Sequence, residues 1–137
     1  MVIVDTGPLA YLLLPGEQTE LAQRAYKKDP SWGSAPLWRS EFRNLVIRYI
    51  RERRIEQKVA DEILKVAEDR MHPRQYNVES DAVIDLALET GLSAYQCEYL
   101  ALARDLNVPL VTTQPELVKA APTLAISLED YVARGSQ

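Results

Sequence analysis

The chain has 137 residues, of which 47% are hydrophobic and 26% are charged, and its formal net charge is −4. A chain near this length fits one domain that buries about 68% of the surface of its unfolded form. This composition excludes an intrinsically disordered or fibrous protein. The single cysteine, Cys97, and the single histidine, His72, exclude a disulfide framework and any site built from several cysteines or histidines. The side chains left for chemistry are mainly carboxylates.

The sequence lacks an export signal and a membrane-spanning segment. Residues 1–7 have neither the basic region nor the long apolar stretch of a secretory signal. The longest apolar run, residues 9–14, ends at Pro15 and is far shorter than the roughly 20 residues of a membrane helix. Since a single cysteine is also typical of a reducing compartment, we expect a cytoplasmic protein.

In the first half of the chain, the pattern predicts one short strand followed mainly by helices. The β-branched run before Asp5 is typical of a strand, and a proline at position 8 fits the first turn of a helix. Apolar residues at helical spacing predict amphipathic helices farther on, the last two forming a hairpin. The expected elements are a strand at 2–4, a helix after the turn at 6–8, a helix over 17–28, a brief strand within 32–36, and helices over 37–53 and 56–70.

In the second half, strands alternate with helices. Gly91 is a usual C-terminal stop for one helix, and Ser93 is a usual cap for the next. The expected elements are a strand at 75–78, helices over 80–90 and 94–106, a strand at 109–112, a short helix from Pro115 and an edge strand at 123–126. This alternation predicts an α/β protein, a three-layer α/β/α fold with a short, mainly parallel sheet, in a single domain over 1–137. Ligands bind such sheets beyond the carboxyl ends of the strands.

Two acids stand in places that suggest a site. Asp5 directly follows the first strand, although it, or Thr6, also has a simple structural use as a helix cap. Glu41 falls on the apolar stripe of its helix, where an inward-facing carboxylate needs a compensating partner. A cation or hydrogen bonds would compensate it, and the structural alternative is an ion pair with an arginine such as Arg39 or Arg43.

Two glutamines complete the set of candidates. Gln96 lies among apolar residues at helical spacing, so its amide needs a partner. Gln114 follows the strand at 109–112 and precedes Pro115, a position where glutamine caps a helix poorly. Four polar side chains from distant segments therefore have the positions needed to converge on one crevice, although each has an ordinary structural explanation when taken alone.

A basic segment surrounds Glu41. Residues 39–58 contain seven basic and three acidic side chains in a chain that is acidic overall. Arg39, Arg43 and Arg48 are candidates for contacts with RNA phosphates. The alternative is a solvated helix face on which arginines pair with Glu52 and Glu56.

Three segments resemble PIN domains of the VapC toxin type, in order and over almost the whole chain. They are VIVDTGPL at 2–9, WRSEFRNL at 38–45 and SAYQCEYLALARDLNVPLVTTQ at 93–114. The resemblance implies a metal-dependent endoribonuclease, usually homodimeric and often neutralised by a VapB-like antitoxin, in which four acids hold Mg²⁺ or Mn²⁺. The matching positions here are Asp5, Glu41, Gln96 and Gln114, and Thr112 resembles the hydroxyl residue beside the metal site.

The sequence departs from this pattern at two of the four positions. Aspartate is expected at 96 and 114, so the four matching side chains carry a formal charge of −2 instead of −4. Asp5 and Glu41 suffice for a single Mg²⁺ with the amide oxygens as weak helpers, whereas two ions about 4 Å apart would be poorly neutralised. Glu98 is an unlikely replacement, because it points about 200° away from position 96 on the helix. Glu116 is an alternative inside the next helix.

Three hypotheses follow. The first is a VapC-like ribonuclease with an altered but usable metal site, which the retained Asp5 and Glu41 favour. The second is a PIN-fold protein that binds RNA or an antitoxin-like partner without cleavage, which the glutamines favour. The third, a nucleotide-binding module, is disfavoured because the sequence has no Gly-x-Gly-x-x-Gly or Walker motif.

Overall fold

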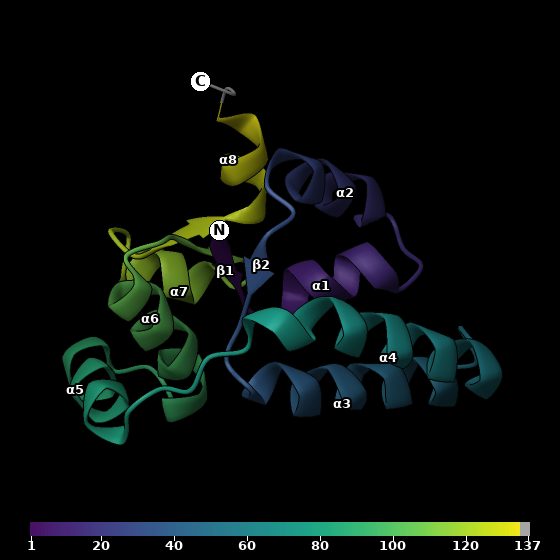
Figure 1. Ribbon diagram of the computed structural model, residues 1–137, viewed down its shortest axis with the longest axis horizontal. Helices are drawn as coiled ribbons and strands as arrows, with labels where there is room; N and C mark the ends of the chain where they lie inside the picture. The colour runs from purple at the N-terminus through teal and green to yellow at the C-terminus, as the bar shows by residue number, and fades with distance from the viewer. Residues whose placement is uncertain (135–137) are drawn as a thin grey trace.

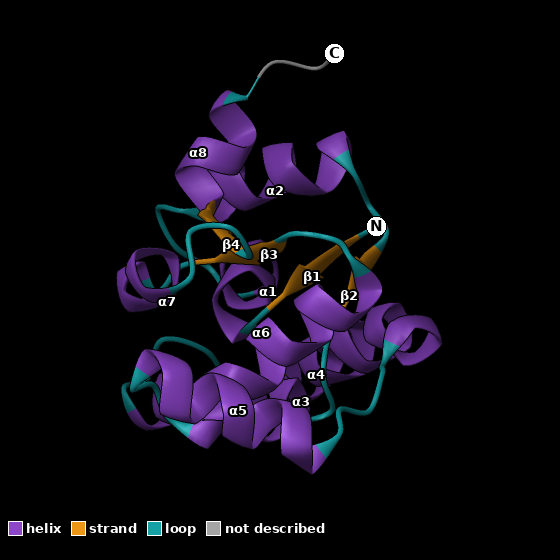
Figure 2. Cartoon of the chain, turned by 90° about the vertical axis from the view of Figure 1, so that its left-hand side faces the viewer, coloured by secondary structure: helices purple, strands orange, loops and turns teal. Residues whose placement is uncertain are grey.

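The centre of the molecule is a parallel four-stranded sheet with helices on both faces (Figures 1 and 2). The computed structural model describes residues 1–134. The strands are β1 (Val2–Val4), β2 (Trp32–Gly33), β3 (Leu110–Thr112) and β4 (Ala125–Ser127), in the order β2-β1-β3-β4. All three strand pairings are parallel, with Ile3 opposite both Gly33 and Leu110. The predicted three-layer α/β/α fold is confirmed.

Helices make up the two outer layers. Figure 2 shows α2 and α8 on one side of the sheet and α3 to α6 on the other. The helices are α1 (Thr6–Leu13), α2 (Thr19–Lys28), α3 (Leu37–Arg51), α4 (Gln57–Met71), α5 (Ser80–Thr90), α6 (Ala94–Leu106), α7 (Pro115–Ala120) and α8 (Leu128–Ala133), with a short 3-10 helix at His72–Arg74. Because both faces of the sheet are covered, every residue of β1 and β3 is buried. Within the described residues, no helix has the length and apolar character needed to cross a membrane.

The predicted hairpin of two long helices is confirmed. In Figure 1, α3 and α4 run side by side and extend away from the sheet. The buried side of α3 carries Trp38, Phe42 and Val46, which lie four residues apart and so form one stripe. Arg53, in the turn between the helices, has φ of 59°, a left-handed conformation that ends α3 sharply.

The short elements differ from the expectations in three ways. The strand expected at 75–78 is only a single bridge between Ser34 and Gln75. The last strand begins two residues later than expected, at Ala125, and α8 follows it directly. The helix α8 was not expected, although Ser127 marks its start by accepting a hydrogen bond from the backbone N–H of Asp130.

The first turn of α1 lies against the chain that leaves β3. A Cβ atom added to Gly7 would lie only 1.8 Å from Oγ1 of Thr113, so position 7 has no room for a side chain. This close approach brings the residues after β1 beside the residues after β3. The carboxyl ends of the two strands therefore form one polar edge.

Candidate active site

Asp5 is a buried carboxylate at the carboxyl end of β1. Its side chain is only 1% exposed and makes no capping hydrogen bond to α1, so the helix-cap explanation does not account for it. Oδ2 accepts a hydrogen bond from the Thr112 hydroxyl at 2.5 Å and another from Nε2 of Gln114 at 3.0 Å. Oδ1 is buried and has no hydrogen-bond partner among residues 1–134. One oxygen of Asp5 is therefore held, and the other is left without a donor.

Glu41 reaches the same region from α3. Its Oε1 accepts hydrogen bonds from the Thr6 hydroxyl at 2.7 Å and the Tyr99 hydroxyl at 2.5 Å. No ion pair involves Glu41 within the described part of the chain, so the alternative of a structural pair with Arg39 or Arg43 is wrong. Two hydroxyl groups compensate the half-buried carboxylate instead.

The two glutamines form a chain of amide hydrogen bonds that ends on Asp5. Nε2 of Gln96 donates to Oε1 of Gln114 at 3.0 Å, and Gln114 donates in turn to Asp5. Gln114 stands at the start of α7 but makes no side-chain cap, as the sequence indicated. Its position is explained by Asp5 and not by its helix.

Gln96 also has a local role. It forms a capping box with Ser93, in which the Ser93 hydroxyl accepts from the Gln96 backbone N–H and the Gln96 side chain accepts from the Ser93 N–H. The Ser-x-x-Gln pattern predicts this box, whereas attention to the apolar stripe alone misses it. Gln96 thus joins the start of α6 to the polar network.

Burial and neighbouring charge shift the pKa values at this edge. Burial raises the pKa of Asp5 to about 6; the hydrogen bonds from Thr112 and Gln114 oppose the rise, and the charge of Glu41 adds to it. Asp5 and Glu41 are therefore close enough for their charges to interact. Burial, together with the hydrogen bond to Glu41, raises the pKa of Tyr99, which keeps its hydroxyl protonated as a donor.

Glu98 is a third acid near Glu41. Burial raises the pKa of Glu98, and the charge of Glu41 contributes to the rise, whereas Asp5 does not. Within residues 1–134, no three histidine, cysteine or acidic side chains are grouped closely enough to hold a metal ion. Glu98 therefore does not complete a three-carboxylate site, in agreement with the sequence argument.

The donor set fits one divalent cation and does not fit two. Mg²⁺ is often held by one or two carboxylates together with water and substrate oxygens, which the free oxygen of Asp5 and the carboxylate of Glu41 can provide. The amide oxygens of Gln96 and Gln114 already accept hydrogen bonds. These hydrogen bonds compete with a role as helper ligands, and a second ion would lack carboxylates.

The predicted RNA-binding arginines lie on two different sides of α3. Arg39 and Arg43 are each two residues from Glu41 in α3, which places them about 160° around the helix from it. Arg48, seven residues on, returns to within about 20° of the direction of Glu41. Within residues 1–134, none of these three arginines forms an ion pair, and the only pair with Glu52 or Glu56 is a loose contact of 3.9 Å from Arg54.

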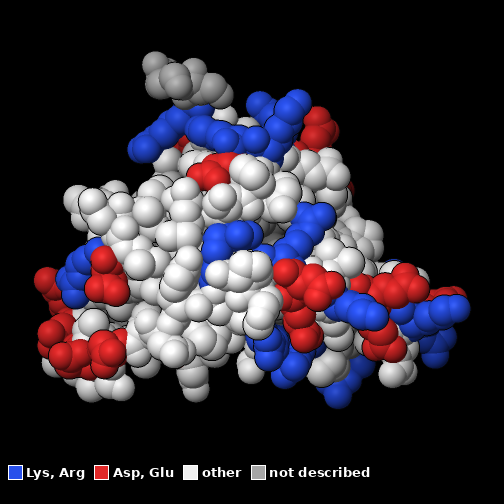
Figure 3. Space-filling model, viewed as in Figure 1, with Lys and Arg blue, Asp and Glu red and all other residues white. Residues whose placement is uncertain are grey.

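Figure 3 shows the charges on the face seen in Figure 1. Basic and acidic side chains alternate at the outer end of the α3–α4 hairpin, and acidic side chains gather near α5 at the opposite side. The face is therefore mixed in sign and does not form one continuous basic surface.

Two site residues were missed by the sequence analysis. Thr6 was considered only as a helix cap, and Tyr99 was not considered at all. Tyr99 is 1% exposed, and its hydroxyl lies 3.3 Å from that of Thr6. A tyrosine in an otherwise apolar helix signals a buried hydroxyl that needs a partner, although the sequence does not say which one.

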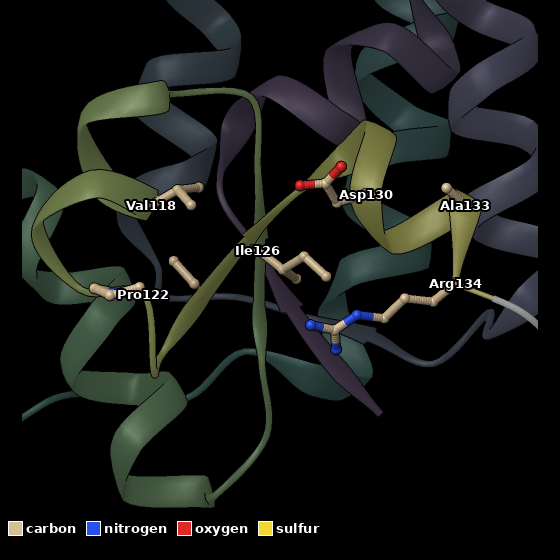
Figure 4. Close-up of a pocket in the computed structure, with 7 residues that line it drawn as sticks. Val118, Pro122, Ile126, Asp130, Ala133 and Arg134 are labelled. Atoms are coloured by element: carbon tan, nitrogen blue, oxygen red, sulfur yellow. The ribbon is translucent and has the colours of Figure 1, made fainter.

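A cavity lies apart from the network around Asp5 and Glu41. Figure 4 shows this space of about 420 Å³ between α7, β4 and α8, lined by residues that include Val118, Ile126, Asp130 and Arg134. None of the residues that line it belongs to the network around Asp5 and Glu41. The candidate site is therefore the polar edge after β1 and β3.

Comparison with known proteins agrees with this architecture. No protein-family model matches the chain. The chain is 25% identical over 126 residues to Ribonuclease VapC3 of Pyrobaculum aerophilum, a match that covers 90% of this chain and 96% of the relative. This chain is similar to a VapC ribonuclease. It also shares the fold of the crystal structure of PAE2754 from Pyrobaculum aerophilum, with a TM-score of 0.76, 23% identity, and coverage of 97% of this chain and 94% of that one.

Proposed function

We propose that this protein is a VapC-like PIN-domain endoribonuclease that uses a single Mg²⁺ or Mn²⁺ ion bound by Asp5 and Glu41. The observation that carries the proposal is how each carboxylate is held. All hydrogen bonds to Asp5 from other side chains go to Oδ2, and all those to Glu41 go to Oε1. One oxygen of each acid is thus held by the protein, which leaves the buried Oδ1 of Asp5 and Oε2 of Glu41 as the oxygens that would bind a cation. The sequence similarity to a protein named as a ribonuclease supports the same conclusion.

The surrounding residues hold the two acids in position. Thr112 and Gln114 fix the plane of the Asp5 carboxylate, and Thr6 and Tyr99 fix that of Glu41. A divalent ion bound there would supply an activated water for attack on the phosphodiester and would stabilise negative charge on the phosphoryl oxygens. Fixed ligands lower the reorganisation needed when the charged substrate arrives.

Arg48 is the basic residue best placed to contact the RNA backbone near these acids. It is exposed, and it lies two helical turns from Glu41 along the same side of α3. Arg39 and Arg43 are included in the proposal as more distant contacts, for RNA that continues around α3. Such contacts with phosphates are sensitive to salt.

The resemblance to VapC toxins extends the proposal to partners. We expect a cytoplasmic homodimer, neutralised by a VapB-like antitoxin that is encoded with it. Sedimentation of the purified protein, alone and after co-expression with the neighbouring open reading frame, measures both associations. A monomer that binds no co-expressed protein would contradict this extension and would leave the ribonuclease proposal standing.

The decisive experiment is cleavage of single-stranded RNA by purified protein in Mn²⁺ or Mg²⁺. The wild type should cleave, Glu41→Gln should lose at least 100-fold in rate, and EDTA should abolish activity. Glu62→Gln is the matched control, because Glu62 is exposed on α4 and outside the network. Equal rates for the wild type and Glu41→Gln would mean that the activity belongs to a contaminant.

A second candidate function is binding of RNA or of an antitoxin-like partner without cleavage. The amide chain from Gln96 through Gln114 to Asp5 favours it, because neutral donors compensate a carboxylate that in a metal enzyme is compensated by a cation. RNA binding by a wild-type protein that shows no cleavage in Mn²⁺ would establish this candidate in place of the first.

A further inference from the structure

An open cavity of about 470 Å³ lies beside the carboxylate site, between the start of α3, the segment before α5, and α6. Its volume is within the range of about 300–1,000 Å³ that is usual for small-molecule pockets. The residues that matter here are apolar Pro36, Val78 and Ile84 and polar Asn77, Ser80 and Glu98. We refer to it as the Glu98 cavity. It combines apolar walls with a few polar groups, as ligand pockets do.

Glu98 connects this cavity with the site. It lines the cavity, and it is close enough to Glu41 for the charge of Glu41 to raise its pKa. The next residue of α6, Tyr99, donates a hydrogen bond to Glu41. Two consecutive residues of α6 thus contact the two places: Glu98 lines the cavity, and Tyr99 binds Glu41. A molecule bound at the carboxylate site therefore has the cavity as its neighbour.

Tyr95 provides an aromatic surface next to Glu98. It lies three residues before Glu98 in α6, a spacing that makes the two side chains neighbours on the helix surface. Tyr95 is 63% exposed. Ile84, on the facing helix α5, lines the cavity and is 56% exposed. Exposed aromatic rings of this kind are the usual platforms on which bases of single-stranded RNA stack.

We propose that the Glu98 cavity binds the base of the nucleotide adjacent to the scissile phosphate, with Glu98 accepting a hydrogen bond from its exocyclic amino group. Tyr95, one helical turn from Glu98 and outside the residues that line the cavity, stacks on the neighbouring base. The proposal rests on the RNA-binding part of the proposed function and adds a preference for particular bases. Adenine, cytosine and guanine carry such an amino group, and uracil does not. Carboxylates accept hydrogen bonds from base amino groups in this way in other complexes.

The charges around the cavity favour a base over a second phosphate. Asp81, Asp85 and Glu89 lie on α5 and Glu98 lies in the wall, so the local charge is negative. A phosphate would be repelled here, whereas the amino edge of a neutral base would be attracted. Uracil has no exocyclic amino group, and its single N3–H donor lies between two carbonyl oxygens that the half-buried Glu98 carboxylate repels, which disfavours it.

The test is RNA binding measured in EDTA, so that affinity is read without cleavage. The probes are labelled heptanucleotides of uridine with a single central adenosine, cytidine or guanosine, compared with the all-uridine heptamer. Wild type should prefer at least one amino-bearing base by about fivefold or more. Glu98→Gln should remove most of this preference, and Tyr95→Ala should weaken binding of every probe by at least about fivefold. Tyr95→Phe should bind like the wild type, because the ring is retained.

Leu88→Ala is the matched control, because Leu88 is 81% exposed on α5 and does not line the cavity. Wild-type affinities in both Tyr95→Ala and Glu98→Gln would overturn the inference and leave cleavage untouched. Unchanged RNA binding with a dimer that dissociates in Tyr95→Ala would also overturn it, by assigning this surface to a protein interface. Binding with base preference but no cleavage would uphold the inference and reject the ribonuclease, and absence of RNA binding would reject both.

Discussion

The side-chain amide of Gln114 donates a hydrogen bond to Oδ2 of Asp5, with 3.0 Å between the two atoms. An aspartate at position 114 would put a second negative charge in this place, whereas the glutamine puts a neutral donor there. The buried carboxylate is therefore partly compensated in the absence of a metal ion. The same contact removes negative charge that would otherwise attract a cation.

Replacing Gln114 with aspartate should lower the free energy of unfolding without metal and raise the affinity for a divalent cation. Gln114→Asp removes a hydrogen bond to a charged group and adds a like charge, so we expect a loss of about 1–3 kcal/mol in EDTA. Mn²⁺ should restore the melting temperature, since an ion that binds only the folded state stabilises it. Gln23→Asp, on the exposed side of α2, makes the same charge change as a control. Calorimetry that shows no gain in Mn²⁺ affinity in Gln114→Asp, or in the double variant with Gln96→Asp, would contradict the convergence of these positions on a metal site.

The free energy of unfolding should depend on pH through Asp5. Its pKa is raised from 3.8 to about 6 by burial, so between these values the folded protein holds a proton that the unfolded chain releases. The contribution of Asp5 is therefore fully present below about pH 4 and is lost as pH rises through about 6, by at most about 3 kcal/mol.

Asp5→Asn isolates this contribution, because the amide keeps an acceptor for Thr112 and does not titrate in this range. Urea unfolding in EDTA at pH 4.5 and pH 7.5 gives the difference between wild type and variant at each pH. The wild type should lose stability relative to Asp5→Asn at the higher pH. Parallel profiles for the two proteins would show that the pKa of Asp5 is not raised.

Tyr99→Phe should release Glu41 from one of its two hydroxyl donors. Loss of a hydrogen bond to a charged group should lower the free energy of unfolding by about 2 kcal/mol. If the protein cleaves RNA, the rate should fall with little change in RNA affinity, because Tyr99 positions Glu41 and does not touch the substrate. Tyr95→Phe, at an exposed position, is the stability control. Unchanged stability and rate in Tyr99→Phe would mean that this contact does not hold Glu41.

Gly7→Ala should destabilise the protein through a steric clash. The added Cβ atom would lie 1.8 Å from Oγ1 of Thr113, and relief requires Thr113 or the start of α1 to move. We expect a loss of about 1–3 kcal/mol, the usual range for overpacking. A double-mutant cycle in urea with Thr113→Ala should recover part of this loss, because two of the three clashing atoms are removed. Strictly additive effects would rule out the close approach.

Arg48→Ala should weaken RNA binding more than Arg43→Ala does. Arg48 lies along the same side of α3 as Glu41, and Arg43 lies about 160° away. Loss of one phosphate contact should reduce the slope of log affinity against log salt by about 0.7, for every sequence alike. Anisotropy titrations at several KCl concentrations measure the slope. A larger effect of Arg43→Ala would place the RNA on the other side of the helix.

Much of the fold follows from local signals in the sequence. The bounds of α5 and α6 are predicted correctly because Gly91, with φ of 75°, and the Ser93 cap separate them sharply. The strand at 2–4 is predicted by its β-branched run. No local sequence signal shows how many residues of an edge segment pair with the sheet. The segment at 75–78 was therefore predicted as a strand, although only Gln75 forms a bridge. The helix α8 was missed because its six residues are too few to show a clear helical spacing of apolar side chains.

The site was predictable where sheet topology decides it. Asp5 follows β1, Thr112 ends β3 and Gln114 follows it, and neighbouring parallel strands bring their carboxyl ends together. Glu41 was predictable as an acid on an apolar stripe. Its partners were not, because Thr6 and Tyr99 lie 35 and 58 residues away in the chain and depend on how α1, α3 and α6 pack.

Gln96 and Gln114 both stand at helix starts; Gln96 closes the capping box of α6, whereas the Gln114 side chain makes no cap on α7. Aspartate at the first residue before α7 would cap that helix better, and a negative charge in the first turn of α6 is favoured by the peptide dipoles. The starts of both helices therefore accept aspartate, whereas the hydrogen bonds from Gln96 to Gln114 and from Gln114 to Asp5 would be lost. Two substitutions would thus change the formal charge of this polar edge by −2 without conflicting with the first turns of α6 and α7.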